Sequence, residues 1–272
     1  MRVAAKKNGA LRIVSLAPSV TSILCAVGAR RNLVGVTKWC GDVAPVGGLP
    51  KLGDCWRLES VEEIAALRPD VVIGSVPFKT ETVAAILAKP WAFVALNPRS
   101  LADVYKDVRL LAGMVERRAN GEKLIRTMER EFTKGGSNPR RGGESARPRI
   151  YCEAWPKPRI SSPPWVAELA EMAGGKFVTR PGSAVSDEEV AAANPEIVVL
   201  AWAAVGGKSK PQQAYSVAAW RDVAAIRTRN VFVVRDEWLN TPGPPLLRGV
   251  KELRRIVALW KAQKRAEGRR GQ

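Results

Sequence analysis

The stretch EEIAALRPDVVIG, residues 62–74, returns in altered form as EEVAAANPEIVVL at residues 188–200. Aligned, the two copies share two glutamates, two alanines, a proline and a valine. Each copy predicts a short helix that ends before the proline, because proline disfavours helix at the residue preceding it. The Val/Ile run that follows is typical of a strand buried on both faces. Such strands belong to parallel sheets covered by helices, so the repeat predicts two similar α/β lobes.

The segments around each copy extend the two lobes in the same order. Residues 11–29 and 148–175 each predict a strand, a turn and a helix with glycine at its end. Residues within the two ranges 32–39 and 230–238 predict further strands, each followed by a tryptophan. We therefore expect an N-terminal lobe over 11–98 and a C-terminal lobe over 148–260, both with mainly parallel sheets flanked by helices.

Residues 99–133 separate the lobes and carry apolar side chains near a 3.6-residue period, with Ser100 as the N-cap. This pattern predicts one long bridging helix of roughly 50 Å at 1.5 Å per residue, with at most a bend at Gly121. Residues 134–147 are rich in Gly, Arg and Pro and predict a basic loop, and residues 261–272 predict a basic tail.

The 272-residue chain is 46% hydrophobic, as expected for a globular protein, and has a net charge of +18 from 44 Lys and Arg against 26 Asp and Glu. That charge suits nucleic acid, an anionic membrane surface or an acidic ligand. Much of it lies in the segments that resemble solvated tails, which argues against nucleic acid as the partner.

The sequence contains no stretch that predicts membrane insertion, because none approaches the ~20 apolar residues that a membrane helix needs. Pro18 interrupts the first apolar run, so no signal peptide is predicted. As written, the chain is expected in the cytoplasm, or in the periplasm or another extracytoplasmic compartment if its start is trimmed.

The chain contains no histidine, which excludes Ser-His-Asp triads and histidine metal sites. Of its four cysteines, Cys25 and Cys152 lie in apolar runs, whereas Cys40 and Cys55 are placed in loops without metal-site spacing. A disulfide between Cys40 and Cys55 stays open. No phosphate loop, nucleophile elbow or acidic cluster is present, so we expect a binding protein and not an enzyme.

Tryptophans gather where a ligand is expected, since open α/β sheets bind ligands beyond the carboxyl ends of their strands. Pockets for flat ligands are lined by aromatic side chains with a few polar groups, and cationic groups suit phosphate, carboxylate or amide oxygens. The aromatic candidates are Trp39, Trp56 and Trp238, followed by Trp155 and Trp202. The polar candidates are Ser19, Lys38, Arg159 and Arg235.

Several motifs together resemble a known family: RIVSLAPSVTSILCAVGA, LVGVTKWC, LPKLGDCW leading into LESVEEIAALRPDVVIG, and DEWLNTPGPPLLRGVKEL. They are similar to the periplasmic-binding-protein-like domain of ABC importers for cobalamin, siderophores and haem, over residues 11–260. The resemblance implies two lobes joined by one long helix, with the ligand in the cleft between them.

Within that superfamily the chain most resembles the cobalamin-binding proteins, whose corrin-packing aromatics match Trp39, Trp56 and Trp238. The resemblance implies non-catalytic binding of a cobalamin, a vitamin B12-type corrinoid, as ligand. The three tryptophans would stack on the ring and the nucleotide base, with the four polar candidates as amide and phosphate contacts. Cys40, beside Trp39, is a candidate thiolate ligand of cobalt.

The resemblance also implies an ABC importer permease as partner, bound through an exposed glutamate on each lobe. Glu81 matches the first position, whereas residues 206–221 contain no acid, which argues against transport. Two alternatives stay open: a siderophore or haem binding protein, and a corrinoid- or nucleotide-modifying enzyme that uses Cys40 or a lysine.

Overall fold

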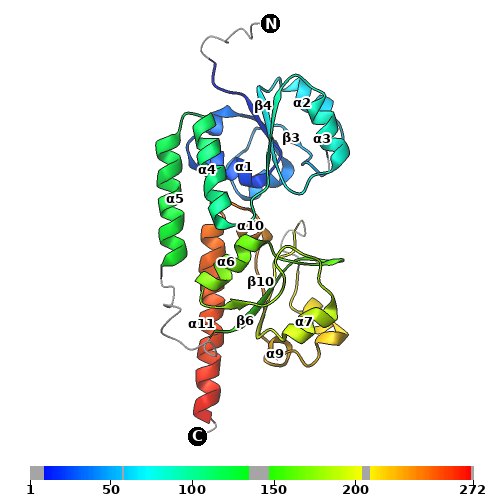
Figure 1. The fold of residues 1–272 in the computed structure, drawn as a ribbon, viewed down its shortest axis with the longest axis vertical. Helices are drawn as coiled ribbons and strands as arrows, with labels where there is room; N and C mark the ends of the chain where they lie inside the picture. The colour runs from blue at the N-terminus through cyan, green and yellow to red at the C-terminus, as the bar shows by residue number, and fades with distance from the viewer. Residues whose placement is uncertain (1–8, 57, 135–146, 204–208, 271–272) are drawn as a thin grey trace. The chain divides into compact units, whose positions relative to one another are not determined.

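The computed structural model describes residues 9–56, 58–134, 147–203 and 209–270. The chain forms two compact units (Figure 1). Unit 1 contains the residues up to Pro98 together with Ala102–Arg126, and unit 2 contains Arg99–Leu101 and Thr127–Gln272. Each unit is built on a five-stranded sheet, so the predicted fold class of two similar α/β lobes is confirmed.

Unit 1 has a fully parallel sheet with the strand order β3-β2-β1-β4-β5. Its strands are β1 (Ile13–Ser15), β2 (Leu33–Thr37), β3 (Lys51–Leu52), β4 (Val71–Ser75) and β5 (Ala92–Leu96). Its short helices are α1 (Pro18–Ala26), η1 (Arg30–Asn32), η2 (Lys38–Asp42), α2 (Val61–Ala66) and α3 (Thr80–Leu87). Because every pair is parallel, the carboxyl ends of all five strands lie at one edge of the sheet.

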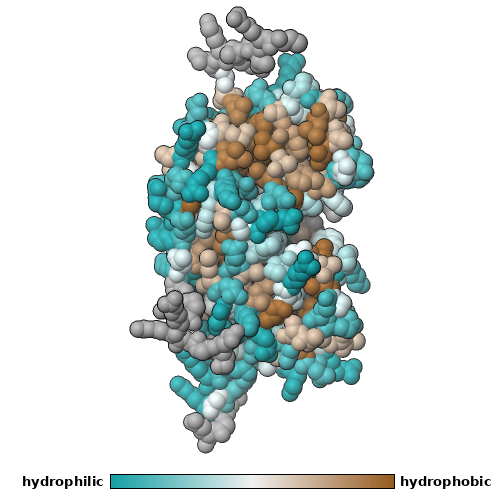
Figure 2. All heavy atoms as spheres, viewed as in Figure 1, coloured by the Kyte–Doolittle hydropathy of each residue, from teal (hydrophilic) through white to brown (hydrophobic). Residues whose placement is uncertain are grey.

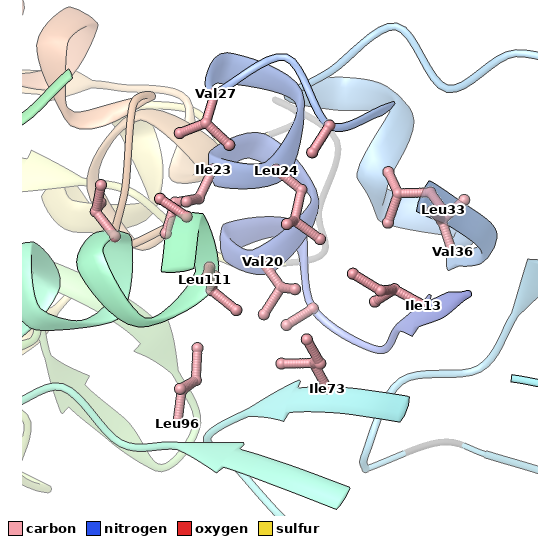
Figure 3. Close-up of a cluster of buried hydrophobic side chains, with 14 of the residues drawn as sticks. Ile13, Val20, Ile23, Leu24, Val27, Leu33, Val36, Ile73, Leu96 and Leu111 are labelled. Atoms are coloured by element: carbon pink, nitrogen blue, oxygen red, sulfur yellow. The ribbon is translucent and has the colours of Figure 1, made fainter. Parts of the chain in front are cut away.

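The core of unit 1 lies on both faces of its sheet. On one face, Val20 and Ile23 of α1 belong to the same buried cluster as Ile13 and Ile73 (Figure 3). On the other face, Val72 belongs to a second buried cluster, together with side chains of α2 and α3. Successive side chains of a strand point to opposite faces, so a strand covered on both sides needs an uninterrupted apolar run. This explains the Val/Ile run of the first copy of the repeat.

Unit 2 has the strand order β10-β9-β6-β7, and β8 also pairs with β6. Its strands are β6 (Arg149–Pro156), β7 (Arg159–Ser161), β8 (Lys176–Phe177), β9 (Ile197–Leu200) and β10 (Val231–Val233). Only the β6–β7 pair is antiparallel among the pairs described for this sheet. Its helices are α6 (Pro164–Met172), α7 (Asp187–Ala193), α8 (Gln212–Tyr215), η4 (Ala218–Trp220), α9 (Ala224–Arg227), α10 (Asp236–Leu239) and α11 (Leu246–Arg270).

The second copy of the repeat forms α7 and β9, as predicted. A capping box begins α7: the Ser186 hydroxyl accepts from the Glu189 N–H, and the Glu189 carboxylate accepts from the Ser186 N–H. Asn194, in the left-handed region at φ 43°, ends the helix just before Pro195. The local sequence therefore sets both ends of this helix.

The prediction of a single helix over 99–133 is wrong, because α4 (Leu101–Met114) and α5 (Arg118–Thr133) are separate helices. Glu116 adopts a left-handed φ of 57°. The Arg117 N–H then donates to the Ala112 carbonyl at 2.8 Å, and the Glu116 N–H donates to the Gly113 carbonyl at 3.3 Å. This is the Schellman arrangement that ends helices, here without the glycine that usually signals it.

The two helices pack against each other through Gly121. A Cβ atom at Gly121 would lie 2.6 Å from the Ala112 Cβ, which is closer than two carbon atoms can pack. An ion pair between the Arg109 Nε and the Glu122 Oε1 at 2.8 Å joins the same helices. Gly121, predicted as a bend, is therefore a point of close approach between the two helices of a hairpin.

The C-terminal residues also differ from the prediction, since α11 continues to Arg270 where a tail was expected from residue 261. The predicted basic loop at 134–147 falls almost entirely outside the described residues. Among the residues that the structure describes, no helix is long and apolar enough to cross a membrane.

Candidate functional site

Two predicted tryptophans lie at the carboxyl edge of the sheet of unit 1. Trp56 follows β3 and Trp39 follows β2, and these strands are neighbours. Trp56 is 54% exposed and lies in a turn, where its backbone N–H donates to the Asp54 Oδ1 at 2.9 Å. The topology therefore brings Trp39 and Trp56 to one edge, as the position of a ligand site in α/β sheets requires.

Lys38 and Trp39 form a cation–π pair in η2. The Lys38 Nζ lies 4.9 Å from the ring centroid of Trp39, Lys38 is exposed, and Trp39 is half-buried. The pair places a cation beside an aromatic surface at the strand ends.

Ser19 and Cys40 follow β1 and β2 in the chain, but both residues are buried in the interior of unit 1. Ser19 is buried in the first turn of α1. The Cys40 Sγ accepts a hydrogen bond from the Thr21 Oγ1 at 3.0 Å and lies 3.2 Å from the Thr37 Oγ1. Burial raises the pKa of the Cys40 thiol, which favours the protonated form. The structure therefore gives no support to Cys40 as a cobalt-binding thiolate.

The cysteines form no disulfide, which answers the question left open for Cys40 and Cys55. Cys55 is buried beside Gly74, where an added Cβ would lie 2.4 Å from its sulfur. Burial, followed by the charge of Asp54, raises the pKa of the Cys55 thiol to about 12. Both thiols are structural side chains of the core.

Unit 2 carries a comparable row of tryptophans at the carboxyl ends of three strands. These strands, β10, β9 and β6, are neighbours in that order and parallel. The tryptophans at these ends are Trp238, Trp202 and Trp155, respectively. Trp155 is half-buried, and its Nε1 donates to the Lys157 carbonyl at 2.9 Å. The topology therefore places all three predicted tryptophans of unit 2 at one edge.

Trp238 lies in α10 and is close to two arginines. Arg235 and Arg248 have their guanidinium carbons 5.8 Å and 5.9 Å from its ring centroid. Arg235 is exposed and forms an ion pair with Glu237. A Cβ on Gly249 of α11 would lie 2.2 Å from the Trp238 carbonyl oxygen, so this glycine lets α11 pack against the backbone of Trp238. Arg248 is a residue that the sequence reasoning missed.

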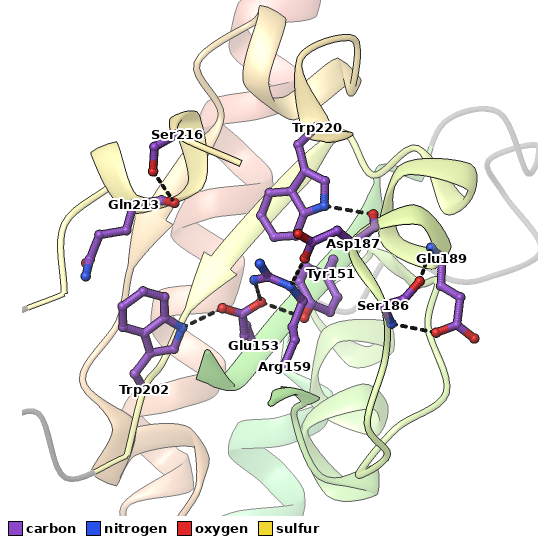
Figure 4. Close-up of polar contacts among 10 residues, drawn as sticks. All are labelled: Tyr151, Glu153, Arg159, Ser186, Asp187, Glu189, Trp202, Gln213, Ser216 and Trp220. Carbon is purple, nitrogen blue, oxygen red and sulfur yellow. Dashed lines mark hydrogen bonds and ion pairs between the residues drawn. The ribbon is translucent and has the colours of Figure 1, made fainter. Parts of the chain in front are cut away.

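Glu153 is the centre of a buried polar network in unit 2 (Figure 4). Its Oε1 accepts from the Trp202 Nε1 at 2.8 Å, and its Oε2 accepts from the Tyr151 hydroxyl at 2.7 Å. Arg159 forms an ion pair with Glu153 and a second one, at 2.7 Å, with Asp187. Burial raises the pKa of Glu153, whereas the Arg159 charge opposes that shift.

The contacts of this network occupy the polar groups of Arg159 and Trp202. Arg159 also stacks on Trp220, with its guanidinium carbon 4.3 Å from the ring centroid, and Trp202 is buried. Both predicted ligand contacts are thus already engaged inside unit 2, where they fix the strand ends. Glu153 could have been found from sequence as an acid in an apolar strand two residues from Tyr151, because alternate residues share a face.

The remaining predicted residue, Glu81, is exposed in the first turn of α3. Within the described ranges, no group of three or more His, Cys, Asp or Glu side chains is arranged to hold a metal ion. The chemistry available at the two edges is therefore aromatic stacking, cationic contacts and hydrogen bonding.

Relatives of known sequence identify the kind of protein. The profile of the periplasmic binding protein family matches residues 13–237. A vitamin B12-binding protein of Vibrio parahaemolyticus is 24% identical over 252 residues, 89% of this chain and 87% of the relative. An uncharacterized ABC transporter substrate-binding lipoprotein of Bacillus subtilis is 25% identical over 256 residues, 89% of this chain and 78% of the relative.

Solved structures agree on the fold. The apo periplasmic heme-binding protein RhuT of Roseiflexus is 25% identical, with a TM-score of 0.76 over 93% of this chain and 100% of its own. The periplasmic vitamin B12-binding protein BtuF of Vibrio cholerae has a TM-score of 0.71 at 19% identity, over 92% and 97% of the two chains. The family and these named relatives are binding proteins and not enzymes. The chain belongs to the periplasmic binding protein family.

Proposed function

We propose that this chain binds a cobalamin-type corrinoid through Trp39 and Trp56 of unit 1 and Trp238 of unit 2. The observation that carries the proposal is the exposure of Trp56, a residue that is 54% exposed at the edge where the strands end. An indole left in water at the position where this architecture binds ligands is well suited to stacking on a flat ring. The vitamin B12-binding relatives support the same ligand class.

The cations beside the other two tryptophans suit the periphery of a corrinoid. Lys38 lies over Trp39, and Arg235 and Arg248 lie near Trp238. A cobalamin carries amide carbonyls around its ring and a phosphate in its nucleotide loop, and both accept hydrogen bonds from cationic donors. Stacking contributes about 0.5–1.5 kcal/mol per aromatic pair beyond the burial of apolar area.

The chain is poorly supplied with ligands for haem iron, which proteins hold with His, Cys, Met or Tyr. It has no histidine, and Cys40, Cys55 and Cys152 are buried. A cobalamin needs no metal ligand from the protein, because its own nucleotide base can occupy the lower position on cobalt. This difference favours the corrinoid.

Haem is the second candidate because Tyr215 is 36% exposed on α8, the helix that follows β9. Its phenol oxygen is a donor of the kind that holds ferric haem. Heme-binding proteins, such as RhuT, resemble this chain in fold as closely as the vitamin B12-binding protein BtuF does, so the fold supports both alternatives. The corrinoid and haem proposals therefore make opposite predictions for Tyr215.

We also propose that the protein works outside the cytoplasm and delivers its ligand to an ABC permease, with Glu81 as the docking acid of unit 1. The substrate-binding lipoprotein of Bacillus subtilis supports this setting. Glu81→Lys should leave ligand affinity unchanged and weaken permease binding, as measured by co-purification with a candidate permease.

Ligand binding is tested by titrating the full chain with cyanocobalamin and, separately, with haemin, following tryptophan fluorescence and retention on a desalting column. Trp56→Ala should weaken cobalamin binding about 10- to 100-fold, the range expected when a central aromatic contact is removed. Trp39→Ala and Trp238→Ala should act in the same direction.

Tyr215→Phe is the matched control, since it alters an exposed aromatic side chain outside the proposed contacts. It should leave cobalamin binding unchanged. No cobalamin retained at micromolar protein would overturn the proposal, and so would wild-type affinity in both Trp56→Ala and Trp238→Ala. Tight haemin binding that is lost in Tyr215→Phe would establish the haem alternative.

A further inference from the structure

The last turns of α11 form a basic helical surface, and none of its residues is among the proposed ligand contacts. Residues 261–269 contain four cationic side chains and one carboxylate. In unit 2 these turns extend past the sheet and the shorter helices (Figure 1), and the end of the helix is strongly hydrophilic (Figure 2). All side chains from Lys264 to Arg269 are exposed.

Pairing with acids does not account for this charge. The Lys264 Nζ pairs with the Glu267 Oε2 at 3.1 Å. Within the described part of the chain, Arg265 and Arg269 have no carboxylate partner. Favourable interaction with the helix macrodipole explains a cation in the final turn, as at Arg269, but fades beyond that turn and so does not explain Arg265 or Lys261.

The arginines share a face of the helix. Ala262, Arg265, Ala266 and Arg269 are spaced by three and four residues, so they line a single stripe of an α-helix. They also line a shallow depression on this helix. The two alanine side chains are short, which leaves both guanidinium groups open to a broad anionic surface.

We propose that this stripe, Ala262 to Arg269 of α11, binds the surface of an anionic phospholipid bilayer. Charge complementarity carries the proposal: the stripe is basic, the chain has a net charge of +18, and each Lys or Arg near an anionic membrane surface contributes about 1 kcal/mol of attraction. The helix lies on the surface and does not insert, because its exposed end lacks the large apolar side chains of an interfacial helix.

A membrane is favoured over nucleic acid as the polyanion because this chain is similar to an ABC transporter substrate-binding lipoprotein, and a lipoprotein works at a membrane. The surface would hold the protein near the bilayer whatever ligand it carries. The inference therefore does not depend on the corrinoid assignment.

Co-sedimentation with vesicles tests the proposal, using the full chain with phosphatidylcholine alone and with phosphatidylcholine and phosphatidylglycerol in equal amounts. Binding is expected only to the anionic vesicles and should weaken steeply as salt is added. The double variant Arg265→Gln/Arg269→Gln should bind these vesicles on the order of 30-fold more weakly, which corresponds to about 1 kcal/mol per arginine.

The matched control is Arg31→Gln/Arg221→Gln, which removes the same charge from exposed positions elsewhere. It should bind anionic vesicles within about twofold of wild type, since these arginines lie outside the stripe. Equal losses in both double variants would reduce the effect to diffuse net charge and overturn the proposal. No binding to anionic vesicles, or tighter binding to a DNA duplex at the same salt, would overturn it as well.

Discussion

Asp107 on α4 is a partly buried carboxylate with an unusual titration. Burial, and then the charge of Asp103, raise the pKa of Asp107 to about 6 from 3.8. Between these values the folded state binds more protons than the unfolded state, so this group's contribution to stability falls as pH rises from about 4 to about 6. Asp107→Asn removes this loss of stability. It should stabilise the protein at pH 8 by about 1–2 kcal/mol, less than the full pKa shift implies, because solvent screens a partly exposed group.

Urea unfolding of Asp107→Asn and wild type at pH 4 and pH 8 measures this effect. The two proteins should be close in stability at the lower pH and differ at the higher one. Asp42→Asn, which neutralises an exposed carboxylate of the same unit, serves as the control and should change stability little at either pH. A variant less stable than wild type at pH 8 would show that the Asp107 charge is favourable in the fold.

For single residues, the position in the fold was easier to predict from sequence than the side chains that the residue contacts. Trp39, Trp56 and Trp238 could be placed at strand ends because a buried strand and the turn after it are visible in sequence. Arg159 and Trp202 were assigned to the ligand by the same reasoning, but they contact Glu153 instead. Such a network joins separate segments of the chain, and one sequence contains no signal for which side chains meet.

The hairpin of α4 and α5 depends on Gly121, where the two helices approach closely. Gly121→Ala would place a Cβ 2.6 Å from the Ala112 Cβ, and neither backbone-bound carbon can move away alone. Overpacking of this kind costs about 1–3 kcal/mol, which exceeds the gain of up to about 1 kcal/mol in helix propensity. Gly121→Ala should therefore lower the melting temperature.

Gly113→Ala is the matched control on the other helix of this hairpin. A Cβ there would meet only the Arg118 Nε at 3.8 Å, an ordinary contact. This change should leave the melting temperature unchanged or raise it slightly through helix propensity. If both substitutions stabilise the protein equally, the helices do not approach as closely as described.

Helix ends with a recognisable local sequence signal were predicted well, and helix ends without one were not. Pro69 and Pro195 follow the two repeat helices at their predicted ends. The break between α4 and α5 falls at Glu116, a residue type that rarely adopts a left-handed φ, so the sequence pattern continues across it. The end of α11 lacks apolar periodicity, yet Ala, Lys, Arg and Glu are strong helix formers, and this propensity was overlooked.

The charge of the whole molecule predicts how its stability responds to salt. A net charge of +18 makes the folded state repel itself, and salt screens this repulsion. Raising ionic strength from about 0.01 M to about 0.15 M shortens the Debye length from about 30 Å to about 8 Å. The melting temperature should rise by about 2–4 °C for each kcal/mol of repulsion removed.

Differential scanning calorimetry in sodium chloride and in choline chloride checks this expectation. Both salts should act alike at equal ionic strength, because screening does not depend on the cation. A melting temperature that falls with both salts would indicate that favourable ion pairs dominate over net repulsion. A rise in only one salt would point to a bound ion.

The buried thiols have a practical consequence for studying motion. Cys40, Cys55 and Cys152 are buried and Cys25 is half-buried, and burial raises the pKa of all four thiols. Maleimide reagents attack exposed thiolates, so a cysteine introduced at an exposed lysine of each unit, such as Lys79 and Lys210, would be labelled in preference to the native ones. Fluorescence or spin-label distances can therefore be measured with and without ligand while the native cysteines are kept.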